Sequence, residues 1–361
     1  MRKVTLCLPI LFAACVLTTA AQQPQNQKPK FKAIWEPVNY PYDAELKDVW
    51  FVSADEGWVV GHATSDAGEG GVILHTKDGG QHWDAQLGDP HSATREFENV
   101  FFLDAKHGWA TQAGGGAVVR TQDGGQTWDS VSQLGNPMSF TFATTDVGFY
   151  LDGSRMYRTQ DGGHTWKQVF TCQTKVEVDG LARDVECNFR SISFPSAKIG
   201  YASTADLPNK ASAIAKTEDG GMTWSISRFL PDAAAMDRGL YFADENVGYI
   251  RTYTGKLFAT ADGGKEWRGV PQSAPAGPIR FADSQVGWVV RGTTVIYTAD
   301  GGKRWNSAEV RFPAGVFSSS LPTHDRGYVV GDHGMIYRYR IVPIEYTAKG
   351  MLPAAAIAAA Q

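Results

Sequence analysis

Thr76-Lys-Asp-Gly-Gly-Gln-His-Trp83 is the first of six copies of the phrase Thr-x-Asp-Gly-Gly-x-x-Trp, and this repeat decides the fold. Asp followed by two glycines is typical of a tight hairpin, because the carboxylate accepts hydrogen bonds from nearby backbone N–H groups and glycine takes positive φ without strain. A β-rich run precedes each copy and the Trp opens another, so each phrase is predicted to be the turn between two antiparallel strands. The repeated side chains are Asp78, Asp123, Asp161, Asp219, Asp262, Asp300, Trp83, Trp128, Trp166, Trp224, Trp267 and Trp305.

A second pattern brings the number of units to seven. In six units a Phe stands six residues before a Gly-aromatic pair, as Phe51 does before Gly57 and Trp58. In the seventh unit Leu321 takes the place of the Phe. Apolar residues two positions before the Phe have the period of a half-buried strand. We therefore interpret each unit as four antiparallel strands, A to D in chain order, and predict an all-β, seven-bladed β-propeller of four-stranded blades.

The seventh unit lacks a fourth strand of its own. It ends near Tyr339 without a further Trp, whereas residues 31–38, ahead of the first strand A, carry Trp35. We expect this N-terminal strand to complete the last blade, because pairing there closes the ring and removes an exposed sheet edge. The alternative is that residues 31–40 are only a linker.

The N-terminus has the features of a secretory leader, predicted over residues 1–21. Two basic residues are followed by an apolar run and by the small-residue cleavage site Thr19-Ala20-Ala21. Cys15 leaves lipid attachment open, so the mature protein is either soluble or a lipoprotein. In both cases it is expected outside the cytoplasm, in the periplasm, in the thylakoid lumen or secreted.

The rest of the chain divides into three predicted parts. Residues 22–30, rich in Gln and Pro, form a flexible spacer, and residues 31–340 form the single propeller. Residues 341–361 form an apolar, Ala-rich tail that is either a frayed helix or a docking segment, and the sequence assigns it no function.

Two cysteines remain after the leader. Cys172 and Cys187 both lie in the longest insertion, between Trp166 and Phe194. In an oxidising compartment such a pair is predicted to form a disulfide. The insertion contains no His, which argues against a metal or catalytic role for the pair.

The repeated aspartates suggest a structural role rather than chemistry. One Asp per unit spreads the carboxylates around a ring, and motifs that build a fold repeat whereas catalytic motifs normally do not. The eight histidines show no metal-ligand spacing, so we expect neither a metal nor a cofactor. The formal net charge of −4 gives no indication of nucleic-acid binding.

Three stretches carry a family resemblance: residues 57–61 (Gly-Trp-Val-Val-Gly), 118–128 and 157–166. They resemble the Asp-box, or bacterial-neuraminidase, repeats, and in particular those of the photosystem II stability/assembly factor family. The resemblance covers residues 31–340. It implies a seven-bladed propeller, exported to the thylakoid lumen or periplasm, that acts without catalysis as a chaperone-like binder during assembly of the photosystem II reaction centre.

The chain departs from the family pattern in two respects. Most boxes have Thr before the Trp, but this chain has His82, Glu266 and Arg304 in three of its six boxes. The insertion bounded by Cys172 and Cys187 is the second departure.

Two other function classes share Asp boxes. A sialidase-like glycoside hydrolase needs an arginine clamp, whose first arginine precedes the first box, besides a Tyr–Glu pair and an acid Asp. No arginine occurs between Lys3 and Arg95, which lies beyond the first box, so we predict that the protein is not an enzyme. A secreted carbohydrate-binding or adhesion propeller stays open as an alternative.

The expected topology also predicts where a partner binds. Strand alternation places the Asp-box and A–B turns on one face of the ring, and the B–C loops and D-to-A crossings on the other, here called the crossing face. Crossings are long and varied, as recognition loops on scaffolds are. Basic residues at the start of strand A or the end of strand B are predicted to surround the channel mouth on the crossing face: Lys47, Arg190, Arg238, Arg251, Arg280 and Arg291.

We interpret these six residues as a recognition patch for an acidic or carboxylate-bearing protein segment, such as one in a membrane-protein assembly intermediate. The alternative is that they are ordinary solvated charges on an acidic protein. The protein itself is expected to be a monomer without a transmembrane segment.

Overall fold

The structure is a computed structural model that describes residues 30–344, except 41–42, 66–67, 88–95, 115, 136, 138, 179–180, 206, 208–210, 231–234, 272–276, 278 and 293. The chain divides into two units. Ala33–Ile341 is the unit described below, and residues 1–32 and 342–361 form the other. The predicted leader and almost all of the predicted spacer and tail therefore lie outside the described residues. Within the described residues, no helix is long and apolar enough to cross a membrane.

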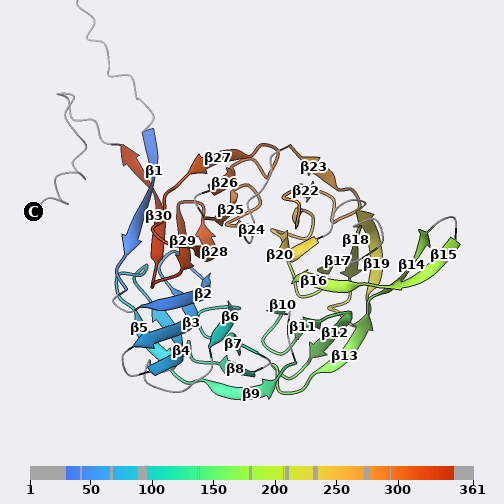
Figure 1. Cartoon of the computed structure of the whole chain (residues 1–361), viewed down its shortest axis with the longest axis horizontal. Coiled ribbons are helices and arrows are strands. Elements are labelled where there is room, and N and C mark those ends of the chain that lie inside the picture. The colour runs from blue at the N-terminus through green and yellow to red at the C-terminus, as the bar shows by residue number, and fades with distance from the viewer. Residues whose placement is uncertain are drawn as a thin grey trace, which may run out of the picture. The chain divides into compact units, whose positions relative to one another are not determined.

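The unit Ala33–Ile341 is a ring of blades, which confirms the predicted propeller (Figure 1). Its described residues form seven four-stranded antiparallel sheets and one two-stranded sheet. Blades 1 to 3 are built from β2 (Ala44–Phe51), β3 (Gly57–Ser65), β4 (Gly68–Thr76), β5 (Asp84–Leu87); β6 (Phe97–Phe102), β7 (Gly108–Gln112), β8 (Ala117–Thr121), β9 (Asp129–Gln133); and β10 (Ser139–Phe142), β11 (Gly148–Asp152), β12 (Arg155–Thr159), β13 (Lys167–Thr171).

The remaining blades follow the same order of strands. Blades 4 to 6 are built from β16 (Asn188–Ser193), β17 (Gly200–Ala205), β18 (Ser212–Thr217), β19 (Ser225–Leu230); β20 (Ala235–Phe242), β21 (Gly248–Thr252), β22 (Leu257–Thr260), β23 (Arg268–Val270); and β24 (Ile279–Phe281), β25 (Gly287–Arg291), β26 (Thr294–Thr298), β27 (Asn306–Glu309). Blade 7 contains β28 (Val316–Thr323), β29 (Arg326–Gly331), β30 (Ile336–Ile344) and β1 (Lys30–Val38).

The N-terminal strand closes the ring, as predicted. β1 pairs with β30 as the outermost strand of blade 7. Trp35 stacks on Trp288 of blade 6, with ring centroids 5.3 Å apart, and also contacts Phe312 and Tyr339. Closure therefore joins the two ends of the ring through both a backbone ladder and an aromatic cluster.

The Gly-aromatic repeat explains how neighbouring blades pack. The ring of Phe51 lies directly over Gly57, where an added Cβ would come within 2.4 Å of it. On its other side Phe51 stacks on Tyr328 of blade 7, with centroids 3.6 Å apart, and its edge meets Trp83 at 89°. Glycine is needed because the Phe ring occupies the space that any side chain would fill.

The same arrangement recurs at the next five interfaces. Each strand-A Phe stacks on the strand-B aromatic of the preceding blade, with centroids between 3.5 and 4.4 Å apart. The strand-B aromatics are among the most buried side chains of the protein, at 0 to 3% exposure. At the last interface Leu321 replaces the Phe, and Trp288 instead lies over Gly327.

The insertion between blades 3 and 4 forms an arm beside the ring (Figure 1). It consists of β14 (Gln173–Val178) and β15 (Leu181–Glu186), which pair antiparallel as the two-stranded sheet. Cys172 and Cys187 form a disulfide at the base of this arm, which confirms the predicted bridge.

Candidate functional site

Each Asp box is a closed hydrogen-bonded turn. In blade 2 the Thr121 hydroxyl donates to Asp123 Oδ1 at 2.8 Å and accepts the Gly125 N–H at 2.8 Å. Thr127 donates its backbone N–H to Asp123 Oδ1 at 2.9 Å and its hydroxyl to Oδ2 at 2.6 Å. Both oxygens of the carboxylate are thus occupied within the turn itself.

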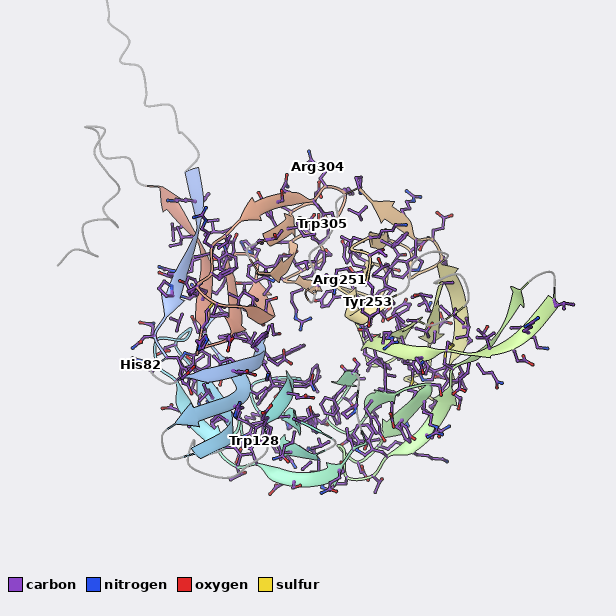
Figure 2. All side chains as sticks on the ribbon, in the orientation of Figure 1. His82, Trp128, Arg251, Tyr253, Arg304 and Trp305 are labelled. Atoms are coloured by element: carbon purple, nitrogen blue, oxygen red, sulfur yellow. A yellow bond between two sulfur atoms is a disulfide. The ribbon has the colours of Figure 1, made fainter. Side chains whose placement is uncertain are left out.

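The box turns are fastened to the A–B turns of their own blades. In blade 2 the Gly124 N–H donates to the carbonyl of Lys106 at 3.0 Å, and all six boxes make this bond. Box turns and A–B turns therefore lie at the same end of the blades, as strand alternation predicts. Figure 2 shows His82 and Arg304, from boxes 1 and 6, far apart on the outer part of the ring.

The three boxes that lack Thr before the Trp behave differently. Arg304 replaces the hydroxyl by donating Nε to Asp300 Oδ2 at 2.8 Å, and the His82 ring contacts Asp78 Oδ2 at 2.5 Å. Glu266 has no side-chain donor and supplies only its backbone N–H, at 3.0 Å from Asp262 Oδ1.

The carboxyl pKa values follow this difference. The hydroxyl and backbone N–H of Thr127 lower the pKa of Asp123 to about 2, and the Arg304 guanidinium does the same for Asp300. The pKa of Asp262 is also lowered, first by the backbone N–H of Glu266 and then by the Thr260 hydroxyl. Because the folded pKa lies below the ordinary value of 3.8, these carboxylates stabilise the fold above that pH and lose the effect as pH falls towards 2.

Supplying the missing hydroxyl is expected to lower the pKa of Asp262 further. The variant Glu266→Thr gives Asp262 Oδ2 the donor that Thr127 gives Asp123, so the pKa of Asp262 should fall further below its ordinary value. Carboxyl NMR titration measures this value directly. Glu266→Val, which adds no donor, is the control, and an equal shift in both variants would contradict the account.

A cavity of about 440 Å³ lies in the central channel. Strand-A residues that face the channel line it, together with residues of the A–B turns. Besides the strand-A Phe residues that stack between blades, its lining includes the aromatic residues Trp50, Phe101, Phe140 and Tyr241, and hydroxyl and amide groups from Asn99, Ser139, Thr141, Ser191 and Ser193. Sequence analysis missed this lining, although the alternation that marks the buried residues of strand A also places the residues between them towards the channel.

The two charged residues of the cavity lining hold neighbouring blades together. Asp48, only 6% exposed, accepts the Ser318 hydroxyl of blade 7 at 2.6 Å and the Val100 N–H of blade 2 at 3.2 Å. Arg280 donates Nε to the carbonyl of Ser319, also in blade 7, at 3.0 Å. The described lining therefore offers one carboxylate, whereas glycoside hydrolysis normally uses a pair flanking the scissile bond.

Of the six basic residues of the predicted patch, the structure describes the side chains of four, and these four lie in different surroundings. Lys47 lies in β2, pairs with Glu45 and stands over the Phe317 ring at 5.3 Å. Arg190 lies half-buried at the equivalent position of β16. Arg238 and Arg291 belong to β20 and β25, but their side chains lie outside the described part of the structure.

Two of the six do not occupy the expected surface. Arg251 is 1% exposed and donates Nε to the carbonyl of Gly277 at 3.1 Å, so it lies buried at the junction of blades 5 and 6 (Figure 2). Arg280 lies three positions closer to the A–B turn than Lys47 or Arg190 does in its own strand, and lines the inside of the channel. Within the described residues, no group of three or more His, Cys, Asp or Glu side chains could hold a metal ion.

Part of the chain matches the model of a known protein family. Residues 27–197 match the family model described as "Photosynthesis system II assembly factor YCF48". The resemblance to photosystem II assembly factors is confirmed. No curated protein gives a significant match to the sequence.

Solved structures share the fold along most of the chain. YCF48 bound to a D1 peptide superposes with a TM-score of 0.62 at 19% identity, covering 85% of this chain and 96% of that one. YCF48 from Cyanidioschyzon merolae gives 0.63 at 20% identity, covering 85% and 98%. The GH74 enzyme of Niastella koreensis gives 0.58 at 15% identity, covering 84% of this chain and 53% of that one. Because binders and hydrolases both appear, these likenesses show the fold alone.

Proposed function

We propose that this protein is a non-catalytic, exported propeller that acts as a protein-binding scaffold or assembly chaperone in the manner of photosystem II assembly factors. The match of residues 27–197 to that family carries the proposal. The single carboxylate of the described channel lining and the box carboxylates engaged in their own turns support a role without catalysis. Turnover of a sialyl, glucosyl or galactosyl chromogenic substrate, abolished by changing one carboxylate, would overturn this part.

Export is supported by the cysteines as well as by the predicted leader. The disulfide between Cys172 and Cys187 is buried at the base of the arm, with both residues 0% exposed. Disulfides form and persist in oxidising compartments such as the periplasm. The thylakoid lumen and the periplasm are the compartments that the family resemblance implies.

The proposed partner is an acidic or carboxylate-bearing protein segment that binds the crossing face. YCF48 binds a D1 peptide, which makes such a peptide the appropriate probe. Arg190 and Arg238 are the proposed contacts, because both stand four residues before the Phe of their strand A and so near its crossing-face end. Arg251 is left out of the proposed contact surface because it is buried.

Reversing these two charges is expected to remove peptide binding without unfolding the ring. For the variant Arg190→Glu/Arg238→Glu, anisotropy of a labelled D1 peptide should show at least a tenfold loss of affinity, roughly 1.4 kcal/mol, because attraction becomes repulsion. Stability should change by less than about 1 kcal/mol, as is usual for surface substitutions. Binding by the unchanged protein should weaken as salt is added.

Lys106→Glu/Lys198→Glu is the matched control. These two exposed lysines lie in A–B turns, on the opposite face, and their reversal changes the net charge by the same amount. It should leave peptide binding unchanged. Equal loss in both variants would reduce the effect to overall charge, and no binding by the unchanged protein would reject a D1-like partner.

A further inference from the structure

A basic side chain directly precedes the Asp box in blades 1 to 4. Strand pairing places it opposite the strand-B aromatic of its own blade, and it packs over that ring. The four residues are His75, Arg120, Arg158 and Lys216. Because the strand-B aromatics are buried at the interface with the next blade, these basic groups are partly withdrawn from water, and their charged forms need a counter-charge.

Three of the four blades supply an acidic neighbour from their own strands and turns. In blades 1 and 2 an Asp of the outer strand lies opposite the basic residue, as Asp129 does opposite Arg120. In blade 4 the Lys216 ammonium pairs with Glu218 at 2.7 Å. The same position of the repeat is therefore compensated in two different ways.

Blade 3 has neither arrangement. Its outer strand β13 places Lys167 opposite Arg158, so two like charges face each other on one side of the sheet. Position 160, which corresponds to Glu218 of blade 4, is Gln160. Like charges directly opposite each other destabilise a sheet. Burial lowers the pKa of the Arg158 guanidinium below its ordinary value, despite the opposing effect of the Asp219 carboxylate.

A cavity of about 520 Å³ lies beside this pair, and both Arg158 and Lys167 line it. All seven lining residues are described, and none of them is acidic. The carboxylates of boxes 3 and 4 accept hydrogen bonds inside their own turns. Arg158 donates Nε to the Gly220 carbonyl at 3.3 Å, which holds the guanidinium across the interface of blades 3 and 4. Among the described residues, no hydrogen bond uses its two terminal nitrogens.

The chemistry of the lining indicates the class of ligand. Two facing cations without a carboxylate match the charge of roughly −1.5 to −2 that a phosphate monoester carries at pH 7. Arginine binds phosphate oxygens through its paired N–H groups, and lysine adds a point charge. The cavity has the size of pockets for small organic ligands, and Val169 and Met222 add apolar surface for the organic part of an ester.

We propose that this cavity, here called the blade-3 site, binds the phosphate group of a phosphate monoester between Arg158 and Lys167. The bound anion takes the place of the carboxylate that blades 1 and 2 carry in their outer strands. The blade-3 site lies at the box end of its blade, because Arg158 directly precedes box 3 and Lys167 directly follows it. It is therefore separate from the peptide contacts proposed on the crossing face, and neither proposal depends on the other.

Isothermal titration calorimetry of the full chain with phenyl phosphate tests the site. At constant ionic strength phenyl phosphate should bind, and phenyl sulfate, which has the same ring but one charge fewer, should bind more weakly. Lys167→Asp gives blade 3 the charge pair that blade 2 has. This variant should weaken the binding of phenyl phosphate by about tenfold or more without lowering the melting temperature, because a like-charge pair becomes an opposite-charge pair.

Lys106→Asp is the matched control. It changes the net charge by the same amount at an exposed position of an A–B turn in blade 2, and it should leave the binding of phenyl phosphate unchanged. Cosedimentation with vesicles that contain phosphatidic acid decides whether the ester is a lipid headgroup, and vesicle binding that Lys167→Asp removes would support the site with that ligand. The proposal is overturned if neither phenyl phosphate nor the vesicles bind, if Lys167→Asp binds like the unchanged protein, or if both variants lose binding equally.

Discussion

Deleting residues 31–38 is expected to lower the melting temperature by on the order of 10 °C or more. The deletion removes the outer strand of blade 7 and with it Trp35, which packs against Trp288, Phe312 and Tyr339. It also removes Glu36, which pairs with Arg338 and Arg340 of β30. The strand pairing between β1 and β30, the aromatic cluster and the ion pairs are therefore lost together, and β30 becomes an open edge of the sheet. Thermal unfolding followed by circular dichroism measures the effect.

Point variants on the same strand separate its contributions. Trp35→Ala alone should account for about 3–5 kcal/mol, the usual cost of truncating a packed Trp. Lys32→Ala, at an exposed position of β1, should stay within about 0.5 kcal/mol of the unchanged protein. A deletion variant that melts like the full chain would show that β1 does not close the ring.

Trp109→Ala is expected to be the most costly single truncation at the interface of blades 2 and 3. Trp109 is 0% exposed, stacks on Phe142 with centroids 3.7 Å apart, and donates its indole N–H to the Gly162 carbonyl at 2.9 Å. Its loss should cost about 3–5 kcal/mol, towards the upper end, because the cavity is accompanied by a carbonyl without its donor. Chemical denaturation measures the change in the free energy of unfolding.

Trp128→Ala is the matched control in the Asp-box repeat. This Trp is half-buried and meets Phe102 edge-on, with centroids 5.9 Å apart. Because it removes less area from water, its truncation should cost about half as much as that of Trp109. The reverse order would mean that the box tryptophans, rather than the strand-B aromatics, dominate blade packing.

The sequence predicted the architecture because the repeated motifs are local. Thr121, Asp123 and Thr127 form a complete turn within one short segment, and the positive φ of Gly124 and Gly125 is required by that turn alone. Six such turns, with the Phe and Gly-aromatic spacing, leave little choice of strand order. The disulfide was predictable from a count, since only two cysteines lie beyond the predicted leader.

The channel surface could not be read from the sequence in the same way. Arg251 lies near the end of strand B, a position that predicted an exposed charge, yet it is buried and donates its Nε–H to the Gly277 carbonyl. Asp48 looks like any acidic strand residue, but it bonds to blades 2 and 7 at once. Burial and partners of these side chains depend on contacts between blades that are remote in sequence.

The sequence by itself therefore determined the all-β class, the seven units, the closing strand and the disulfide, because each follows from residues that meet within one repeat or from a simple count. Only the tertiary structure decided which charges remain at the surface, which residues line the channel, and how Gly57 and its counterparts receive the Phe ring. Closing the ring brings strand A of one blade against strand B of the preceding blade, and that contact sets burial, hydrogen-bond partners and access to solvent together.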